Sequence, residues 1–258
     1  MTSTRSSRFS IKHALLVAFV GIPLALFVSL RVLADPRPTG EPGAEAEALA
    51  RAMLVAIDDD AWQRTGAVRW SFGGKRDHLW DRQRQLARVQ WKGVEVLVNL
   101  QTQEGKAWRK GKEVSGGKAE KLVRKAYEAW INDSFWLNPV SKIFDEGTER
   151  SVVPQDEGLR GLLVEYTSGG VTPGDAYLWI VGDDGLPVAW KMWTSNIPFG
   201  GAKATWEGWT TLDTGAKIST EHDVAVIGQL PIGNLAGAAD LATLEPGDDP
   251  FAPLLNGG

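Results

Sequence analysis

The stretch Gly174–Trp193, GDAYLWIVGDDGLPVAWKMW, decides the fold of this chain. It contains two apolar runs, 175–181 and 186–194, separated by a short polar segment that ends in Asp184-Gly185. Short runs rich in aromatic and β-branched residues favour strands. An Asp-Gly pair supplies the positive φ that a tight hairpin turn requires. The stretch therefore predicts two antiparallel strands joined by a short turn.

Segments of the same kind lie on both sides of this hairpin. The further predicted strands are Ala67–Phe72, His78–Trp91, Val94–Leu100, Val140–Asp145, Gly161–Thr167, Lys203–Leu212 and Ala216–Val226. Apolar residues three and four positions apart predict helices at Glu45–Asp60 and Lys118–Ile131. Short connections between strands favour antiparallel pairing. Blocks of strands separated by helices, without regular β-α-β alternation, indicate an α+β fold.

The first 34 residues predict export. Arg5, Arg8 and Lys12 precede an uncharged apolar run at 14–30, an order typical of export segments. The length of the run lies between that of a signal peptide and that of a spanning helix, so residues 1–34 form either a signal anchor or a cleaved signal peptide. An anchor would hold the protein in the inner membrane through residues 14–30 with its domain in the periplasm. Cleavage would release it into the periplasm.

The composition of the remaining chain excludes several classes of function. All 32 acidic residues follow residue 34 and the net charge is −4, which disfavours binding to nucleic acid. There is no cysteine, and neither His78 nor His222 has a second ligand at metal-binding spacing, so we interpret both as ordinary strand residues. Motifs of hydrolases, nucleotide-binding loops and dinucleotide-binding folds are absent. We predict no catalytic residue, metal ligand or cofactor.

Twelve tryptophans, all between Trp62 and Trp209, are the most informative part of the composition. Large rings on one face of a sheet either fill a core or line a cavity for an apolar ligand. The residues that we predict to line such a cavity are Trp70, Phe72, Trp80, Tyr166, Tyr177, Trp179, Trp190, Met192 and Trp206. Trp193 lies an odd number of residues from Trp190, and Trp209 an odd number from Trp206, so each is expected on the opposite face of the sheet. Aromatic residues on both faces indicate a second contact surface and a partner, such as an envelope protein.

Three stretches carry a resemblance to a known group of proteins: Val68–Asp81 (VRWSFGGKRDHLWD), Ala129–Gly147 (AWINDSFWLNPVSKIFDEG) and Gly174–Trp193. They resemble uncharacterised bacterial exported proteins whose fold is similar to that of the lipoprotein carriers LolA and LolB. The resemblance spans about residues 61–226. It implies a curved antiparallel sheet, an incomplete β-barrel, covered by two or more helices. It also implies that acyl chains are held between sheet and helices without catalysis.

The resulting organisation has four parts. Residues 1–34 are the signal anchor or signal peptide, and residues 35–44, rich in Pro, Gly and charge, form a linker. Residues 45–227 form the LolA-like half-barrel domain. Residues 228–258, rich in Gly, Pro, Ala and Asp, are expected to form a low-complexity C-terminal tail.

Three functions are compatible with these features. The first is a non-enzymatic binding protein that holds a lipid, an acyl chain or another apolar small molecule. The second is a protein-interaction module of a cell-envelope assembly, acting through Trp193 and Trp209. The third is an envelope hydrolase whose carboxylates are not identifiable from the sequence, because catalytic carboxylates need only be close in space.

Overall fold

The computed structural model describes residues 35–156, 158–168, 173–195, 197, 199–225 and 227–255. The predicted export and membrane segment therefore lies outside the described residues. Among the helices that are described, none combines the length and the apolar character needed to cross a membrane.

Most of the strands that follow residue 147 in the chain form one sheet, which we call sheet A. Its strands, in spatial order, are β1 (Glu41–Pro42), β8 (Thr148–Pro154), β9 (Arg160–Tyr166), β10 (Ala176–Val181), β11 (Pro187–Trp193), β12 (Ala202–Thr205), β15 (Asp223–Val224) and β16 (Gly228–Gln229). Every pairing in it is antiparallel. The predicted hairpin is confirmed: β10 pairs with β11, Trp179 lies opposite Trp190, and Gly185 in the turn has φ of 82°.

The strands between residues 67 and 114, joined by one strand from the C-terminal part of the chain, form sheet B, again with antiparallel pairing throughout. Its spatial order is β17 (Ile232–Ala238), β2 (Ala67–Phe72), β3 (Arg76–Asp81), β4 (Leu86–Trp91), β5 (Val94–Asn99), β6 (Gly105–Arg109) and β7 (Lys112–Val114). A separate ribbon pairs β13 (Thr210–Thr211) with β14 (Lys217–Ile218).

The two sheets meet through backbone hydrogen bonds that continue the antiparallel pattern. Leu230 N donates to His222 O at 2.8 Å, and Ile232 N donates to Thr220 O at 2.9 Å. The segment that leads into β15 therefore runs beside the segment that leads into β17. Within the described residues no pairing joins β1 to β7. The predicted α+β fold, with a curved antiparallel sheet that forms an incomplete barrel, is confirmed.

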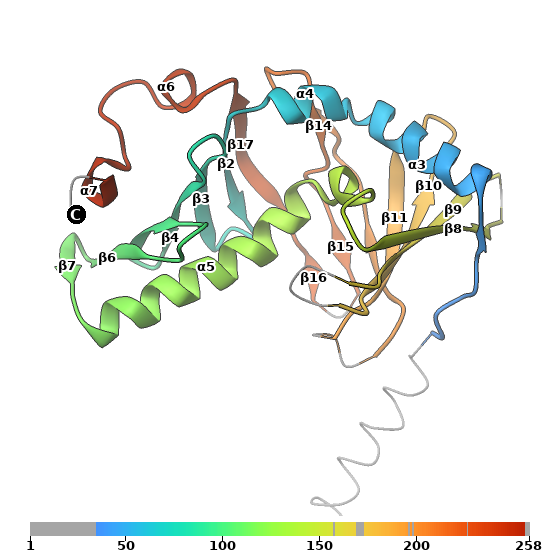
Figure 1. Cartoon of the computed structure of the whole chain (residues 1–258), viewed down its shortest axis with the longest axis horizontal. Helices are drawn as coiled ribbons and strands as arrows, with labels where there is room; N and C mark the ends of the chain where they lie inside the picture. Colours follow the sequence, from blue (N-terminus) through green and yellow to red (C-terminus); the bar gives the residue numbers. More distant parts are fainter. Residues whose placement is uncertain are drawn as a thin grey trace, which may run out of the picture.

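The helices cover the inner face of this curved surface. They are α3 (Ala44–Ala56), α4 (Asp59–Arg64), α5 (Gly117–Leu137) and the short 3-10 helix η2 (Pro139–Lys142). Figure 1 shows α5 lying along sheet B and reaching towards sheet A, while α3 lies over β8 and β9. Helix α5 extends to Leu137, beyond the predicted end at Ile131, because the apolar spacing continues through Phe135.

The predicted linker is packed against the outer face of sheet A. Asp35 accepts a hydrogen bond from Lys191 Nζ at 2.6 Å, and its carbonyl accepts one from Trp193 Nε1 at 2.7 Å. Further along, Arg37 pairs with Glu165 at 3.2 Å, and β1 then pairs with β8. We call residues 35–42 the N-terminal strap. Pro and Gly keep this segment extended, and the sheet supplies the partners that fix it.

The C-terminal segment differs from the tail that we expected. β17 pairs with β2 along most of its length, so this part of residues 228–258 belongs to sheet B. Residues 239–255, which include α6 (Leu241–Leu244) and α7 (Ala252–Leu255), form a C-terminal strap over the outer face of the same sheet. Phe251, fully buried, packs there with Leu79, Leu86 and Leu97. The composition of this segment predicted a tail because composition carries no information about contacts with residues that are distant in the sequence.

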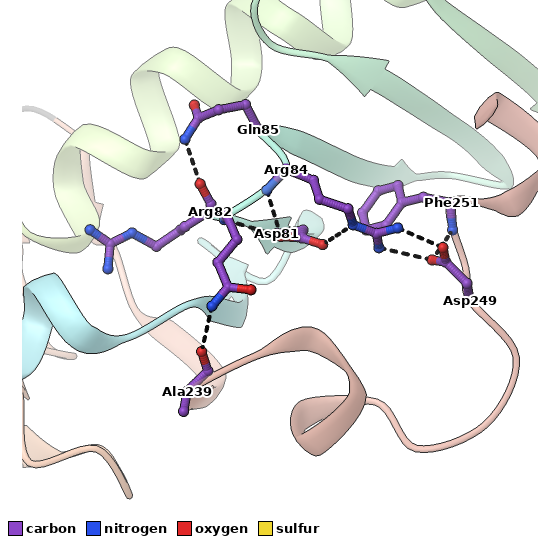
Figure 2. A network of polar contacts seen from close by, with 8 residues as sticks. Asp81, Arg82, Arg84, Gln85, Ala239, Asp249 and Phe251 are labelled. Atoms are coloured by element: carbon purple, nitrogen blue, oxygen red, sulfur yellow. Dashed lines mark hydrogen bonds and ion pairs between the residues drawn. The ribbon is translucent and has the colours of Figure 1, made fainter.

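Polar contacts fix the C-terminal strap to the turn between β3 and β4 (Figure 2). Arg84 donates to both carboxylate oxygens of Asp249, at 2.7 and 3.0 Å, and to Asp81 at 2.5 Å. Gln83 Nε2 donates to Ala239 O at 3.1 Å. The N-terminal strap thus covers the outer face of sheet A, and the C-terminal strap covers the outer face of sheet B.

Candidate functional site

A cavity lies between the inner faces of the sheets and the C-terminal half of α5. Its volume is about 730 Å³, within the range of roughly 300–1,000 Å³ that is usual for small-molecule sites. Helix α4 and the β3–β4 turn contribute from one side, and β9, β10 and β11 from the other. The lining residues are Trp62, Gln63, Trp80, Arg82, Gln85, Glu128, Trp130, Ile131, Asn132, Ser134, Phe135, Trp136, Asn138, Ser141, Lys142, Asp145, Tyr166, Asp175, Tyr177, Trp190, Met192, Thr194 and Ile197.

Trp190 is the centre of the aromatic wall on sheet A. Its ring lies 4.9 Å from that of Tyr177, 5.0 Å from Trp136 and 6.1 Å from Phe135, measured between centroids. Tyr177 lies opposite Met192 across β10 and β11, so strand alternation brings their side chains to the inner face. The side chain of Trp190 is fully buried, which makes the wall part of the core as well as part of the cavity.

The predicted cavity residues divide into two groups. Trp80, Tyr166, Tyr177, Trp190 and Met192 line the cavity. The other four are buried in the layer behind it. Trp70 stacks on His78 with centroids 4.6 Å apart, Phe72 lies under the guanidinium of Arg76, and Trp179 and Trp206 pack against Trp190. Strand parity selected the inner face correctly, but it does not distinguish the residues at the edge of a cavity from those behind it.

Helix α5 supplies cavity residues that we did not select from the sequence. Ile131 and Phe135, one turn apart, line the cavity together with Trp130 and Trp136. All four are half-buried. Helical spacing identified the apolar face only as far as Ile131, and Phe135 and Trp136 lie beyond the predicted end of the helix. The face does pack against sheet B along the first turns of α5, and it lines the cavity only beyond them.

A buried ionic cluster fixes α5 against sheet B. The carboxylate of Asp133 accepts hydrogen bonds from Arg76 at 2.5 and 2.7 Å and makes a 2.7 Å contact with Nε2 of His78. Burial by itself would raise the pKa of Asp133, but the hydrogen bonds from His78 and Arg76 outweigh it and lower the pKa. The position of Ile131 and Phe135 over the cavity follows from this attachment. His78 is therefore more than the ordinary strand residue that we expected.

His222 is also buried, inside the aromatic layer. Its ring lies 4.5 Å from Trp206 and 5.5 Å from Trp136, and Nδ1 lies 3.0 Å from the carbonyl oxygen of Thr205. Burial lowers its pKa, which favours the neutral ring. Neither histidine belongs to a group of three potential metal ligands within the described part of the chain.

Polar groups line the cavity at both ends. On the side of sheet A, Asp145 pairs with Lys142 at 3.5 Å, and Asp175 accepts a hydrogen bond from the amide of Ser195 at 3.0 Å. Burial, followed by the charges of Asp145 and Asp175, raises the pKa of Tyr166, so its phenol stays protonated at neutral pH. On the side of sheet B the charged group is Arg82.

Trp193 and Trp209, which we expected to form a contact surface for a partner, both make contacts within the chain. Trp193 is half-buried, and its indole N–H is bonded to the N-terminal strap. Trp209 is half-buried as well, with its ring 6.3 Å from that of Trp206 and its N–H 3.3 Å from Pro187 O. Much of the aromatic surface that suggested a partner is thus used within the chain.

No protein-family model and no curated protein matches this chain. Solved structures that are similar to it include the following two. A DUF1329 family protein from Desulfovibrio piger is 12% identical, with a TM-score of 0.44 over 82% of this chain and 97% of its own. A putative outer membrane lipoprotein-sorting protein domain from Vibrio parahaemolyticus is 10% identical, with a TM-score of 0.38 over 80% of this chain and 98% of its own.

The two similar structures match the resemblance inferred from the sequence, to uncharacterised proteins with a fold similar to LolA and LolB. At these identities and TM-scores the likeness concerns the fold alone. The choice of ligand therefore depends on the residues of the cavity.

Proposed function

We propose that this protein is an exported, non-enzymatic binding protein that holds the acyl chain of a lipid, or a similar apolar ligand, in the cavity beside α5. The observation that carries the proposal is the set of half-buried apolar side chains, Ile131, Phe135 and Trp136, facing the aromatic wall around Trp190. An acyl chain that lies along these side chains removes their remaining exposed apolar area from water.

The physical driving force is desolvation. Each CH₂ group that leaves water contributes about 0.8 kcal/mol before the costs of ordering and association. The wall is already ordered by ring contacts, so little side-chain entropy remains to be lost on binding. Export is inferred from the basic and apolar pattern of residues 1–34, and it would place the domain among the lipids of the cell envelope.

Two measurements on the full-length protein test this proposal. Native mass spectrometry with lipid extraction asks whether a lipid co-purifies at a fixed stoichiometry. Titration with a nitroxide-labelled stearic acid asks whether the label quenches tryptophan fluorescence at a saturable site. We expect a bound lipid and saturable quenching, because five of the lining residues are tryptophans: Trp62, Trp80, Trp130, Trp136 and Trp190.

A matched pair of variants separates the cavity from the surface. Ile131→Asp places a carboxylate in the apolar part of the cavity and should weaken binding at least tenfold. Val55→Asp makes the same type of change on α3 at a side chain that is 80% exposed, and it should leave binding unchanged. A folded Ile131→Asp protein with undiminished binding would refute the assignment of the cavity.

A further inference from the structure

Arg82 is a cation at the end of the cavity that Trp62, Trp80 and Trp130 line. It follows β3 directly, and its backbone N–H donates to Gly66 O at 2.8 Å. Its guanidinium carbon lies 4.2 Å from the ring centroid of Trp62 and 5.3 Å from that of Trp80. Figure 2 shows this side chain extending away from Arg84 and Asp249, so it takes no part in the contacts of the C-terminal strap.

The guanidinium of Arg82 has no carboxylate partner within ion-pair distance in the described part of the chain. Its Nη1 donates to the carbonyl oxygens of Trp62 and Thr65, and the other N–H groups of the fork have no acceptor among the described residues. Asp59 is the nearby acid that acts on its charge, but the carboxylate of Asp59 accepts its hydrogen bond from Gln63 instead. Burial lowers the pKa of Arg82 to about 10, so it remains a cation at neutral pH.

Two neighbouring indole groups add further unused donors. The Nε1 atoms of Trp80 and Trp130 are buried and have no hydrogen-bond partner among the described residues, and the two rings lie 5.2 Å apart. Trp80 is itself in contact with Arg82. A half-buried guanidinium and two buried N–H groups around one end of a cavity make a donor-rich environment, in which an acceptor would recover the cost of their desolvation.

The acidic groups of the cavity are arranged differently. Asp145 and Asp175 are supplied from the side of sheet A, where they lie near Tyr166. Glu128 on α5 is 67% exposed and points to Arg124, 4.0 Å away. The charge is therefore positive beside Trp62 and Trp80, whereas beside Tyr166 the two carboxylates outnumber the one cation, Lys142, which pairs with Asp145.

We propose that the ligand is an acidic single-chain amphiphile, whose carboxylate or phosphate binds Arg82 beside Trp62, Trp80 and Trp130 and whose acyl chain extends along α5 towards Trp190. This inference deepens the proposed function and depends on it. The reverse orientation would place the anion beside Asp145 and Asp175. The shared chemistry is an anion with several acceptor oxygens, which matches the fork of a guanidinium.

Isothermal titration of the full-length protein with matched ligands provides the test. Oleate, oleyl phosphate and oleyl alcohol have the same chain and differ in the head group. We expect both anions to bind at least tenfold more tightly than the alcohol, because a hydrogen bond to a charged group contributes about 1.5–3 kcal/mol. The ratio of oleate to oleyl phosphate affinity identifies the preferred head group. Acetate and inorganic phosphate, which lack the chain, should show no saturable binding.

Three variants assign the preference to this end of the cavity. Arg82→Gln should remove the difference between oleate and oleyl alcohol while leaving the affinity for the alcohol within twofold, and Arg82→Lys should keep most of the difference. Trp80→Phe keeps an aromatic side chain but loses the five-membered ring with its N–H, so it should weaken oleate binding more than oleyl alcohol binding, even if Arg82→Gln fails to fold. Arg64→Gln, which removes one exposed charge from the neighbouring end of α4, should change nothing.

The outcomes separate the two proposals. Equal affinity of the wild-type protein for oleate and oleyl alcohol would overturn the anion site and leave the proposed function intact. A preference for oleate that survives in folded Arg82→Gln protein would also overturn it. Binding of inorganic phosphate alone, as tightly as oleyl phosphate, would show that the ligand is a free anion. Failure of all three oleyl ligands would remove the proposed function itself.

Discussion

Sheet A and sheet B share the helix α5, yet their inner faces differ in chemistry. Along β4, β5 and β6 the inner face of sheet B is aliphatic and small, and Val123 and Ala126 of α5 pack directly against it. Its buried members are Ala87, Val89, Val94, Val96, Val98 and Ala107. On sheet A the inner face is aromatic around Tyr177, Trp179 and Trp190. The helix closes against sheet B and lines a cavity where it approaches sheet A.

The difference follows from the size and stiffness of the side chains. Valine and alanine leave a shallow surface, so a helix approaches closely and the interface fills to the density of a protein interior. Indole rings are large and have few rotatable bonds. They pack on Phe135 and Trp136 at the end of α5 and leave a cavity beside these contacts. The same helix therefore encloses a core on one sheet and lines a cavity on the other. Five predictions test this contrast, from the largest expected effect to the smallest.

Removing the central ring of sheet A should have the largest effect. Trp190 is fully buried and contacts five other rings. We expect Trp190→Ala to lower the free energy of unfolding by about 4 kcal/mol, from lost transfer energy and an enlarged cavity. Urea denaturation followed by near-UV circular dichroism measures this. Val188→Ala, at a 41% exposed side chain on the same strand, is the control and should change stability by less than about 0.5 kcal/mol.

Breaking the attachment of α5 to sheet B should have the next largest effect. Asp133→Asn removes the charge that neutralises Arg76, and we expect a loss of about 3 kcal/mol in the free energy of unfolding. Asp77→Asn, an exposed carboxylate on the same strand as Arg76, serves as the control. An equal, small effect of both substitutions would show that the buried cluster does not fix the helix.

The same cluster predicts a pH dependence. The pKa of Asp133 is lowered in the folded protein, so its stabilising contribution is complete above the unfolded pKa of about 4 and is lost as the pH falls through the folded value. The difference in stability between the wild-type protein and Asp133→Asn should therefore shrink below about pH 4. Denaturation curves from pH 7 down to pH 3 measure this, and a difference that stays constant would contradict the assignment.

Enlarging side chains along α5 compares the two interfaces directly. Ala126 is fully buried against the valine face, and Ala126→Leu should lower the free energy of unfolding by about 2 kcal/mol through overpacking. Ile131→Phe, little more than one turn further along, projects into the cavity and should change stability by less than about 0.5 kcal/mol. Thermal unfolding of the pair decides the matter: similar losses would mean that α5 packs equally tightly on both sheets.

The smallest effect is expected at the C-terminal strap. Arg84→Gln removes the contacts to Asp249 and Asp81 from a partly exposed side chain, which should cost less than about 1 kcal/mol of global stability. Local opening should still increase, and amides near Phe251 should exchange faster with deuterium. Arg109→Gln, an exposed change on β6, should leave that exchange unaltered. Unchanged exchange in both proteins would show that burial of Phe251 alone holds the strap.

Much of the fold was predictable from local patterns. The hairpin of β10 and β11 was identified from alternating apolar residues and an Asp-Gly turn, and both signals act over only a few residues. The inner-face residues Trp80, Tyr177 and Trp190 were found in the same way, because parity along a strand fixes the face. The contribution of Phe135 was missed because the helix was predicted to end at Ile131, whereas α5 extends to Leu137.

The sequence by itself determined the antiparallel α+β fold, the face on which the rings lie and the pattern of an export segment. Each of these follows from periodicity, turn chemistry or charge within a short window. Tertiary structure alone decided that β17 joins sheet B, that Asp133 binds residues more than fifty positions away, and that Arg82 meets Trp62 at the end of a cavity. These contacts depend on how distant elements pack, and a local pattern carries no information about the distance between two surfaces.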